Sequence, residues 1–333
     1  MSFFNKIKSK PALFISITGM SVSNFISLLP QMEVAYSQNE ESRKSLTVVG
    51  KTTRLRRIGG GRDYANSLPD RVLMLLLYYR LYLTQDFLTL LFKAENKSVI
   101  SRGIHSVQAA FSSVLPIPSR LKSAILTLAE KGGKKPKRIG NVVDFIKAYP
   151  ELTILIDGKE QPINRPEDKE KRKSQYSGKK KRHTLKQLIT TTGKGLIVDL
   201  SPAFAGSTHD YQYFKSYHST ITKGWDEFNS VAYVDSGFQG QSDLDIPIEV
   251  RQIQKAFRGK PLSKQDKQIN KIRAKIRVKC EHTIGQMKKY RIASEIYRNP
   301  KDKYDDTMNL VCGLTNLRII QRFQEATGAT LEF

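Results

Sequence analysis

The strongest constraint on the fold is the segment Leu152–Gly158, in which five apolar or β-branched residues lead into an aspartate and a glycine. A short apolar run that ends at a turn-forming pair predicts a buried strand. An acid that follows such a strand lies where open sheets bind their ligands, beyond the carboxyl end of the strand. The segment therefore suggests a metal-binding or catalytic Asp157, although taken alone it also describes an ordinary turn acid.

The same pattern returns at Ser230–Asp235, an apolar run that ends in aspartate and is followed by Ser-Gly. Between the two acids, His183–Thr190 and Gly195–Ala203 alternate as strands do, and Gly206–Asp210 begins a helix. Three consecutive strands, a helix and a fourth strand form the order of a ribonuclease H-like core, in which neighbouring strands bring two aspartates to one end. We therefore predict an α/β fold with a mixed sheet flanked by helices.

A long helix is predicted for residues 263–290, with a capping-box start at Ser263 and Asp266. One stripe of this helix is apolar and consists of Ile269, Ile272, Ile276, Cys280 and Met287. An adjacent face, at offsets of four and seven residues, carries Arg277, Glu281 and Lys288. A last helix, about Tyr304–Phe323, is apolar almost all round and is expected to be buried.

Positive charge is concentrated in two segments. The 333-residue chain has a formal net charge of +25. Lys159–Lys186 contains 11 Lys/Arg against 4 Asp/Glu, and Arg251–Arg291 contains 14 against 2. Such concentration indicates a polyanionic partner, most often nucleic acid, because Lys and Arg release counterions from phosphates. A membrane surface is the rival, but the first segment lacks the bulky apolar face of a membrane-binding helix.

Cysteine usage and the N-terminus indicate a cytoplasmic protein, and a DNA partner would associate it with the nucleoid. Only Cys280 and Cys312 occur, far apart, which argues against a disulfide framework or a zinc module. The apolar run Ala12–Leu29 is interrupted by serines, a threonine and an asparagine. It is too polar to span a bilayer and lacks a cleavage site, so we expect a soluble helix and no membrane partner.

Helical patterns dominate the first part of the chain. A helix with Ser21 as its N-cap is predicted for residues 19–36, followed by a polar, basic connection, Ser37–Asp63. Leu68–Leu81 is strongly apolar, and two shorter helices follow at Thr84–Phe92 and Lys97–Phe111. The last has one apolar stripe; its opposite face carries Ser98, Ser101, Arg102, His105 and Gln108. This pattern suits a DNA-reading helix-turn-helix, and equally an ordinary three-helix unit; the overall charge favours DNA.

We predict four parts of the chain: an N-terminal helix with a basic linker (1–66), a helix-turn-helix domain (67–131), a catalytic domain (140–323) and a tail (324–333). The joint between the two larger domains is placed in Gly132–Arg138, which is rich in glycine and lysine. A short helix, Val142–Tyr149, is expected before the central strand.

Asp157, Asp235 and Glu281 are three carboxylates set within basic segments. Phosphodiester chemistry uses such a group, because hard oxygen ligands hold two Mg²⁺ ions that clamp the attacking and leaving oxygens. Basic side chains such as Arg277 and Lys288 would neutralise phosphate charge. The ordered set is a far more specific signal than one Asp-Gly pair.

Five short motifs follow one another along the chain: Ile156–Ile163, Tyr176–Lys186, Gly206–Asp210, Val234–Gly240 and Val278–Lys288. Together they resemble the DDE-superfamily transposases of bacterial insertion sequences, in the group related to the eukaryotic Harbinger transposases. The region Leu68–Phe111 resembles the helix-turn-helix that precedes this catalytic domain. The similarity extends over roughly Ser21–Ile320.

The resemblance implies catalytic, metal-binding roles for Asp157, Asp235 and Glu281, with two Mg²⁺ ions (Mn²⁺ as a substitute). It also implies that Arg277 and Lys288 contact DNA ends; Ala274 departs from the family, in which tyrosine is frequent. The implied activity is that of an endonuclease and strand transferase that nicks the ends of an insertion sequence and joins the freed 3′-OH to target DNA. The implied partners are double-stranded DNA, in terminal inverted repeats and in the target, and further copies of the chain in a dimer or larger complex.

Alternatives remain at this point. The chain could be a catalytically silent DNA-binding protein, a decayed or domesticated transposase that acts as a regulator. A ribonuclease H-like RNA nuclease is disfavoured by the N-terminal helices. Asp210 is the rival for the second acid, but it begins a helix and is interpreted as an N-cap with at most a supporting role. The run Lys179, Lys180, Lys181 and Arg182 is expected to meet the DNA backbone without reading bases.

Overall fold

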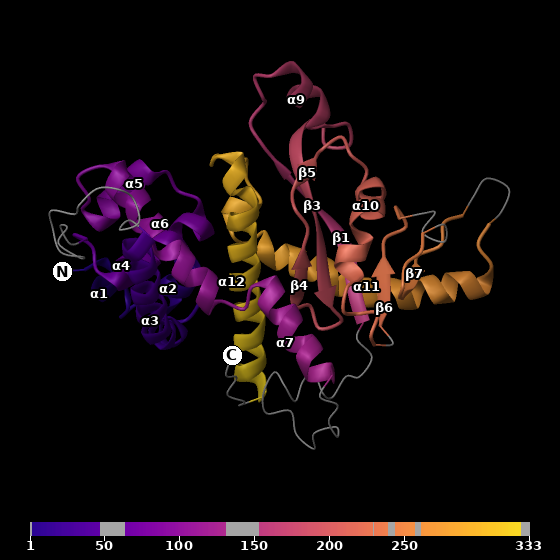
Figure 1. Cartoon of the computed structure of the whole chain (residues 1–333), viewed down its shortest axis with the longest axis horizontal. Helices are drawn as coiled ribbons and strands as arrows, with labels where there is room; N and C mark the ends of the chain where they lie inside the picture. Colours follow the sequence, from indigo (N-terminus) through magenta and orange to yellow (C-terminus); the bar gives the residue numbers. More distant parts are fainter. Residues whose placement is uncertain are drawn as a thin grey trace. The chain divides into compact units, whose positions relative to one another are not determined.

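The computed structural model describes residues 2–46, 64–130, 153–228, 230–238, 244–256 and 261–327. Most of the predicted connection Ser37–Asp63, the joint at Gly132–Arg138 and the helix at Val142–Tyr149 lie outside these residues. The chain divides into two compact units, one of residues 1–115 with 290–292 and one of residues 116–289 with 293–333 (Figure 1). This division differs from the predicted one, which placed residues 1–66 and 67–131 in separate parts.

The described residues of the first unit form helices and the turns between them. Its helices are α1 (Phe3–Ile7), α2 (Pro11–Thr18), α3 (Val22–Leu46), α4 (Leu68–Leu81), α5 (Gln85–Phe92) and α6 (Lys97–Val114). Helix α4 is its centre, because the six residues from Val72 to Leu77 are all at most 1% exposed. Such all-round apolarity is typical of a helix surrounded by others.

Helix α3 is longer than predicted. Ser21 caps it as expected, since its Oγ accepts a hydrogen bond from the Asn24 amide. The helix then continues to Leu46, so the predicted linker from Ser37 is wrong for its first ten residues. The reason is local: Gln38–Lys44 is rich in Glu, Gln, Arg and Lys, which have high helix propensity.

Among the described residues, no single helix is long and apolar enough to cross a membrane. Helices α2 and α3 together pass the same test of length and composition, but the chain bends by 59° between them. Gly19 makes this bend, with a positive φ of 87° that an L-residue rarely adopts.

Arg71 of α4 fixes the surroundings of α6. Its guanidinium lies between the rings of Tyr36 and Tyr64, 4.5 and 4.1 Å from their centroids, and donates a hydrogen bond to the Ser106 hydroxyl. Gly103 allows α6 to approach this cluster, because a Cβ there would meet the Met74 sulfur at 2.8 Å. The buried side of α6 is thus tied to α4, and its other side is left exposed.

The two short helices predicted as a helix-turn-helix are present. Thr84 caps α5 and Asn96 caps α6, each by accepting hydrogen bonds from backbone amides. The turn between them passes through Lys93, which has the left-handed conformation common at helix ends.

The second unit contains a mixed, seven-stranded sheet with the central order β2-β3-β1-β6-β7 (Figure 1). Its strands are β1 (Thr153–Pro162), β2 (Tyr176–Ser177), β3 (Arg182–Thr192), β4 (Ile197–Leu200), β5 (Phe204–Ala205), β6 (Val231–Val234) and β7 (Glu249–Gln252). Strand β3 pairs antiparallel with β1, β4 and β5, whereas β6 is parallel to both β1 and β7. This mixed sheet, flanked by helices, is consistent with the predicted ribonuclease H-like fold.

Two strand predictions need correction. Asp157 does not end its strand, because β1 continues to Pro162 through nine antiparallel pairs with β3. The predicted strand Gly195–Ala203 is shorter in the structure, where β4 covers only Ile197–Leu200 and a separate strand, β5, begins at Phe204. Pro202 lies between them and cannot donate to a sheet ladder. Strand β7, which was not predicted, extends the sheet beyond β6.

Helices cover both faces of this sheet. They are α7 (Pro118–Glu130), α10 (Asp210–Thr222), α11 (Lys264–Met287) and α12 (Tyr304–Thr327), and short 3₁₀ turns occur at Arg291–Ala293 and Lys301–Lys303. The short helix α9 (Lys169–Ser174) buries no residue and lies away from the core. On one face, Ile154 and Ile156 of β1 pack in a core with Phe214 of α10 and Ile125 of α7. Helix α7 therefore belongs to the sheet unit and not to the predicted helix-turn-helix domain.

The opposite face carries Leu155, Asp157 and Lys159, because side chains alternate along β1. Helix α11 lies over it: the Cys280 thiol donates to the Leu155 carbonyl, and burial raises the pKa of this thiol to about 12. Helix α12 lies over Lys159, whose buried ammonium donates to the Tyr304 hydroxyl. The catalytic candidate Asp157 thus faces α11.

Lys122 of α7 and Asp199 of β4 carry opposite charges that influence each other. Lys122 donates to the Thr220 and Ile221 carbonyls and lies close to Asp199. Burial outweighs the attraction of Lys122 and raises the pKa of Asp199 to about 6. The folded chain therefore takes up a proton as pH falls through 6, whereas the unfolded chain does so only near 4, so protonation stabilises the fold below pH 6.

Replacing Asp199 by asparagine is accordingly expected to raise the free energy of unfolding at pH 8, by about 1–3 kcal/mol. At pH 4.5 the difference from the unmodified chain should be much smaller, because Asp199 is then largely protonated. Urea unfolding at the two pH values measures this, with the exposed Asp245→Asn as the matched control. An equal effect at both pH values would contradict the assignment.

Candidate active site

Asp157 and Asp235 occupy equivalent positions on neighbouring parallel strands. The pairs Thr153–Val231, Ile154–Ala232 and Leu155–Tyr233 fix the register between β1 and β6. Continued by two residues, this register places Asp157 beside Asp235, which follows the last residue of β6. The register therefore agrees with the prediction that neighbouring strands bring the two acids together. Asp157, however, lies within its strand and not at the end of it.

Arg277 of α11 bridges the two aspartates. One guanidinium nitrogen is 3.0 Å from the Asp235 carboxylate and the other is 3.9 Å from that of Asp157. The Arg277 side chain is only 8% exposed, against 23% for Asp157 and 45% for Asp235. Arg277 was predicted to contact DNA; in the structure its guanidinium group lies close to both acids.

The Asp157 carboxylate has an unusual electrostatic environment. Burial raises its pKa to about 6. Arg277 and a hydrogen bond from the Gly158 amide, 2.8 Å long, act in the opposite direction, while Asp235 and Glu281 raise the pKa further. Asp235 and Glu281 are therefore close enough to influence the Asp157 carboxyl group. A bound cation would be attracted by the negative charges of these acids.

Glu281 and Lys288 lie further along α11. Glu281 follows Arg277 by one helical turn and is exposed, and Lys288 caps the end of the helix and is also exposed. The first half of α11 is more exposed than its apolar stripe predicted, since the Ile272 side chain is 60% exposed. The buried residues are Arg277, Cys280, Thr283, Ile284 and Met287.

The donor chemistry of the site fits a hard divalent cation. Carboxylate oxygens are the ligands that Mg²⁺ prefers, and Asp157, Asp235 and Glu281 supply only oxygen. Within the described parts of the chain, no three acidic, histidine or cysteine side chains are arranged to hold a metal ion as they stand. Arg277 instead supplies the positive charge between the two aspartates.

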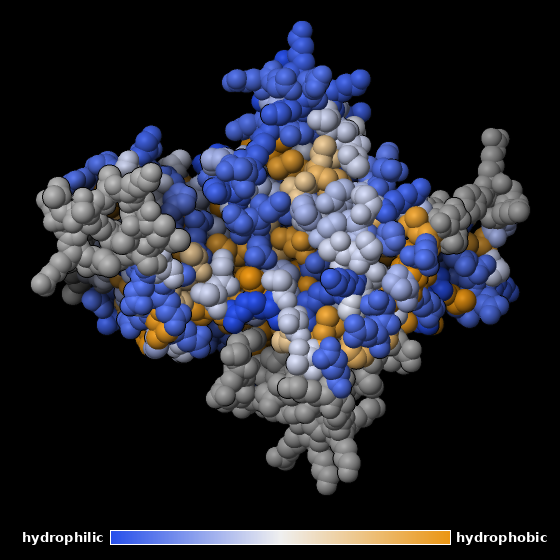
Figure 2. Space-filling model, viewed as in Figure 1, coloured by the Kyte–Doolittle hydropathy of each residue, from blue (hydrophilic) through white to orange (hydrophobic). Residues whose placement is uncertain are grey.

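The basic run lies on a hairpin at one end of the sheet. Lys179, Lys180, Lys181 and Arg182 connect β2 to β3 and are all exposed. Helix α9 precedes this hairpin and carries further lysines and an arginine. Hydrophilic residues gather over this projecting end of the unit, at the top of Figure 2. The hairpin therefore presents cations to solvent, as a contact with DNA phosphates requires.

The other predicted DNA-binding residues belong to the first unit. Ser98, Arg102 and His105 are exposed on α6, and Ser101 is half-buried. The His105 ring is held against its own helix by a 2.7 Å contact between Nδ1 and the Ser101 carbonyl. Among these four residues, Arg102 thus has the long, positively charged side chain that can extend from the helix.

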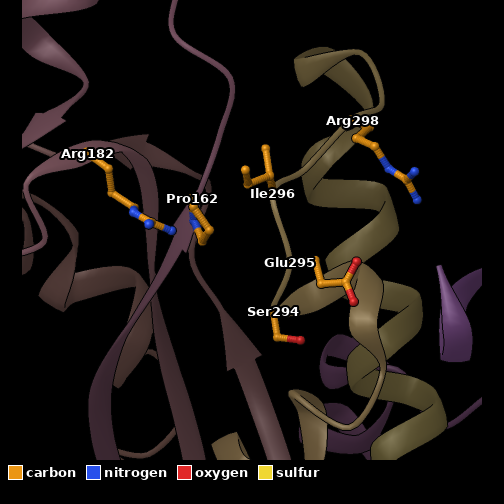
Figure 3. Close-up of a pocket in the computed structure, with 6 residues that line it drawn as sticks. All are labelled: Pro162, Arg182, Ser294, Glu295, Ile296 and Arg298. Carbon is orange, nitrogen blue, oxygen red and sulfur yellow. The ribbon is translucent and has the colours of Figure 1, made fainter.

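A hollow of about 380 Å³ lies beside the far end of β1 and is lined by Pro162, Arg182, Ser294, Glu295, Ile296 and Arg298. Arg182 and Arg298 come from opposite sides of it, with Ile296 and the Glu295 carboxylate between (Figure 3). The two guanidinium groups do not converge, so the hollow is not a preformed anion site.

The interpretation of Asp210 as a helix N-cap is wrong. His209 is the N-cap of α10 and makes no side-chain capping bond, while Asp210 is the first helical residue. The Asp210 carboxylate instead forms an ion pair with Lys186 of β3 at 3.2 Å and lies directly beneath Gly158. Gly158 was interpreted as a turn signal, and the sequence gives no other sign of this contact.

Residues 156–316, which include all three acids, match the family model of the DDE superfamily endonucleases. The chain is also similar to a protein of Microchaete diplosiphon described as a probable transposase for insertion sequence element IS702. The identity is 28% over 266 residues, which cover 78% of this chain and 83% of that protein. No solved structure matches the chain significantly. Together with the paired aspartates, these similarities support a DDE transposase of insertion sequences, with nuclease activity and DNA as its partner.

Proposed function

We propose that this protein cleaves the ends of an insertion sequence and transfers the freed 3′-OH to target DNA. The observation that carries the proposal is the register of β1 and β6, which sets Asp157 beside Asp235, with Glu281 following on α11. Three acids in this order, within a strongly basic chain, suit phosphodiester chemistry better than they suit a DNA-binding protein without activity.

Two reactions follow one another in this proposal. In the first, water attacks phosphorus at the element end, the P–O3′ bond breaks, and the proton of the water leaves to solvent or a carboxylate. The products are a 3′-OH and a 5′-phosphate. In the second, this 3′-OH attacks a phosphorus of the target strand, a target P–O3′ bond breaks, and a new phosphodiester bond joins element and target.

Asp157, Asp235 and Glu281 would hold Mg²⁺, or Mn²⁺ in its place. Two such ions, when bound, supply Lewis-acid stabilisation of the attacking and leaving oxygens. The chain itself contributes the orientation of the acids. Arg277 would favour the ionised form of Asp157 before the metal binds, since it opposes the effect of burial on the pKa of this carboxyl group.

DNA would be held by both units. The hairpin cations Lys179–Arg182 would bind the backbone near the acids, as would Lys288, whereas α6 would read the terminal repeat through Ser98, Ser101, Arg102 and His105. Because each element end needs its own set of acids, the complex should contain at least two copies of the chain, acting in the cytoplasm on the element's DNA.

Arg102→Ala is expected to weaken binding to terminal-repeat DNA by about tenfold and to reduce preference over unrelated DNA, as loss of one base contact does. Lys180→Ala should weaken binding to both DNAs equally and lower the salt slope by about one. Fluorescence anisotropy at several salt concentrations separates the two effects. Equal losses on both DNAs for Arg102→Ala would refute sequence reading by α6.

The proposed function is tested with the purified full-length chain, Mg²⁺ or Mn²⁺, and a duplex that carries the inverted repeats flanking its coding region. We expect nicks with 3′-OH termini at the repeat ends, dependent on the metal and abolished by EDTA. Salt-dependent binding without any cleavage would instead identify a silent DNA-binding protein. Cleavage of an RNA–DNA hybrid in preference to the duplex would identify an RNA nuclease.

A further inference from the structure

Gly158 is a close-packing position in the middle of β1. It pairs with Leu188 of β3, so it lies in an extended strand and not in a turn. A Cβ at this position would meet the Asp210 carboxylate, 2.5 Å from Oδ2 and 2.9 Å from Cγ. Glycine is thus required because an acid lies against the backbone of β1, one residue after Asp157.

The Asp210 carboxylate is held in place from a neighbouring strand. The Lys186 ammonium of β3 lies 3.2 Å from it and also donates a hydrogen bond to the Thr208 carbonyl, just before α10. Lys186 itself pairs across the sheet with Glu160 of β1. This link ties the start of α10, β3 and β1 together on the face of the sheet away from α11.

The peptide between Asp157 and Gly158 is therefore contacted on both faces of the sheet. On one face its N–H donates to the Asp157 carboxylate at 2.8 Å, which fixes the direction of that side chain. On the other face the Asp210 carboxylate lies against Gly158, in the space that a Cβ of residue 158 would occupy. Side chains alternate along a strand, so Asp210 and the Asp157 carboxylate lie on opposite faces.

We propose that Asp210 and Lys186 are positioning residues for the reaction, which fix the Asp157–Gly158 peptide and through it the Asp157 carboxylate. Asp210 acts from the far face of the sheet and is not itself a ligand or a nucleophile. The proposal rests on the proposed function, in which Asp157 binds the metal. Small displacements of such a ligand are costly in rate, because catalytic groups must be held to within about 0.5 Å.

The test compares Asp210→Ala, Asp210→Asn and Lys186→Met in the full-length chain. Hydrogen exchange of peptides spanning residues 155–162, without metal or DNA, reports directly on this strand. We expect these peptides to exchange about tenfold faster than in the unmodified protein. In the cleavage assay, the Mn²⁺ concentration that gives the half-maximal rate should rise about tenfold, while the KM for DNA stays unchanged. Glu249→Gln breaks the exposed pair with Arg251 and is the matched control.

Gly158→Ala provides the second arm, because its methyl group must displace the Asp210 carboxylate. If this clash is the main effect of Gly158→Ala, adding Asp210→Ala should not lower the cleavage rate further. The effects of the two substitutions on the cleavage rate will then be strongly non-additive. Unchanged exchange in the Asp210 and Lys186 variants, or fully additive losses, would overturn the proposal. Faster exchange in a chain that never cleaves DNA would refute the proposed function and leave the positioning contact standing. Should Asp210→Ala not fold, Asp210→Asn keeps the side-chain size and gives the same readouts.

Discussion

Asp157→Asn is expected to lower metal-dependent cleavage of terminal-repeat DNA by at least about 10³-fold, because it removes a charged ligand worth several kcal/mol in the transition state. Asparagine keeps the shape of the side chain, so the effect falls on chemistry. Since burial raises the pKa of Asp157 to about 6, a neutral side chain should leave the folded state as stable as before, or slightly more stable, at neutral pH.

Gel-based single-turnover cleavage measures this loss, and anisotropy with the same duplex checks that DNA binding is kept. The exposed Asp245→Asn serves as the control for a generic loss of negative charge. Glu281→Gln should behave like Asp157→Asn. Cleavage within tenfold of the unmodified rate in either variant would remove that acid from the catalytic group.

Arg277→Met is expected to lower the free energy of unfolding in EDTA by about 1–3 kcal/mol, because it leaves two neighbouring carboxylates without their cation. The loss is smaller than for a fully buried pair, because the Asp235 side chain is 45% exposed and solvent screens its charge. Saturating Mn²⁺ should restore most of the loss by supplying positive charge to the same acids. Cleavage should also fall, through poorer orientation of Asp157.

Urea unfolding with and without Mn²⁺ measures this effect. Arg277→Lys keeps the charge and should lie between the unmodified chain and Arg277→Met. Arg251→Met is the matched control, because Arg251 pairs with Glu249 at the surface and its loss should cost at most about 1 kcal/mol, with or without metal. An Arg277→Met defect that Mn²⁺ does not reduce would show that Arg277 acts only as a packing residue.

Most elements of the sheet unit could be predicted from local patterns. The capping box at Ser263 and Asp266 marks the start of α11, and the apolar run at β6 ends one residue before Asp235, as predicted. These signals are readable because caps and alternation depend on neighbours in the chain. The end of β1 was mispredicted because it depends on residues that are distant in the chain. The last five residues of β1 are strand because β3 pairs with them.

The sequence by itself determined the order of the acids, the apolar strand segments that precede the two aspartates, and the basic segments that surround the acids. Only the tertiary structure decided how these groups are used. It places Arg277 close to Asp235 and Asp157, which are 42 and 120 positions away in the chain, and Asp210 against Gly158, which is 52 positions away. Such contacts depend on the register of β1 against β6 and on the helices packed over each face. A pattern of neighbouring residues does not contain that information, so a glycine required by a carboxylate on the far face was indistinguishable from one required by a turn.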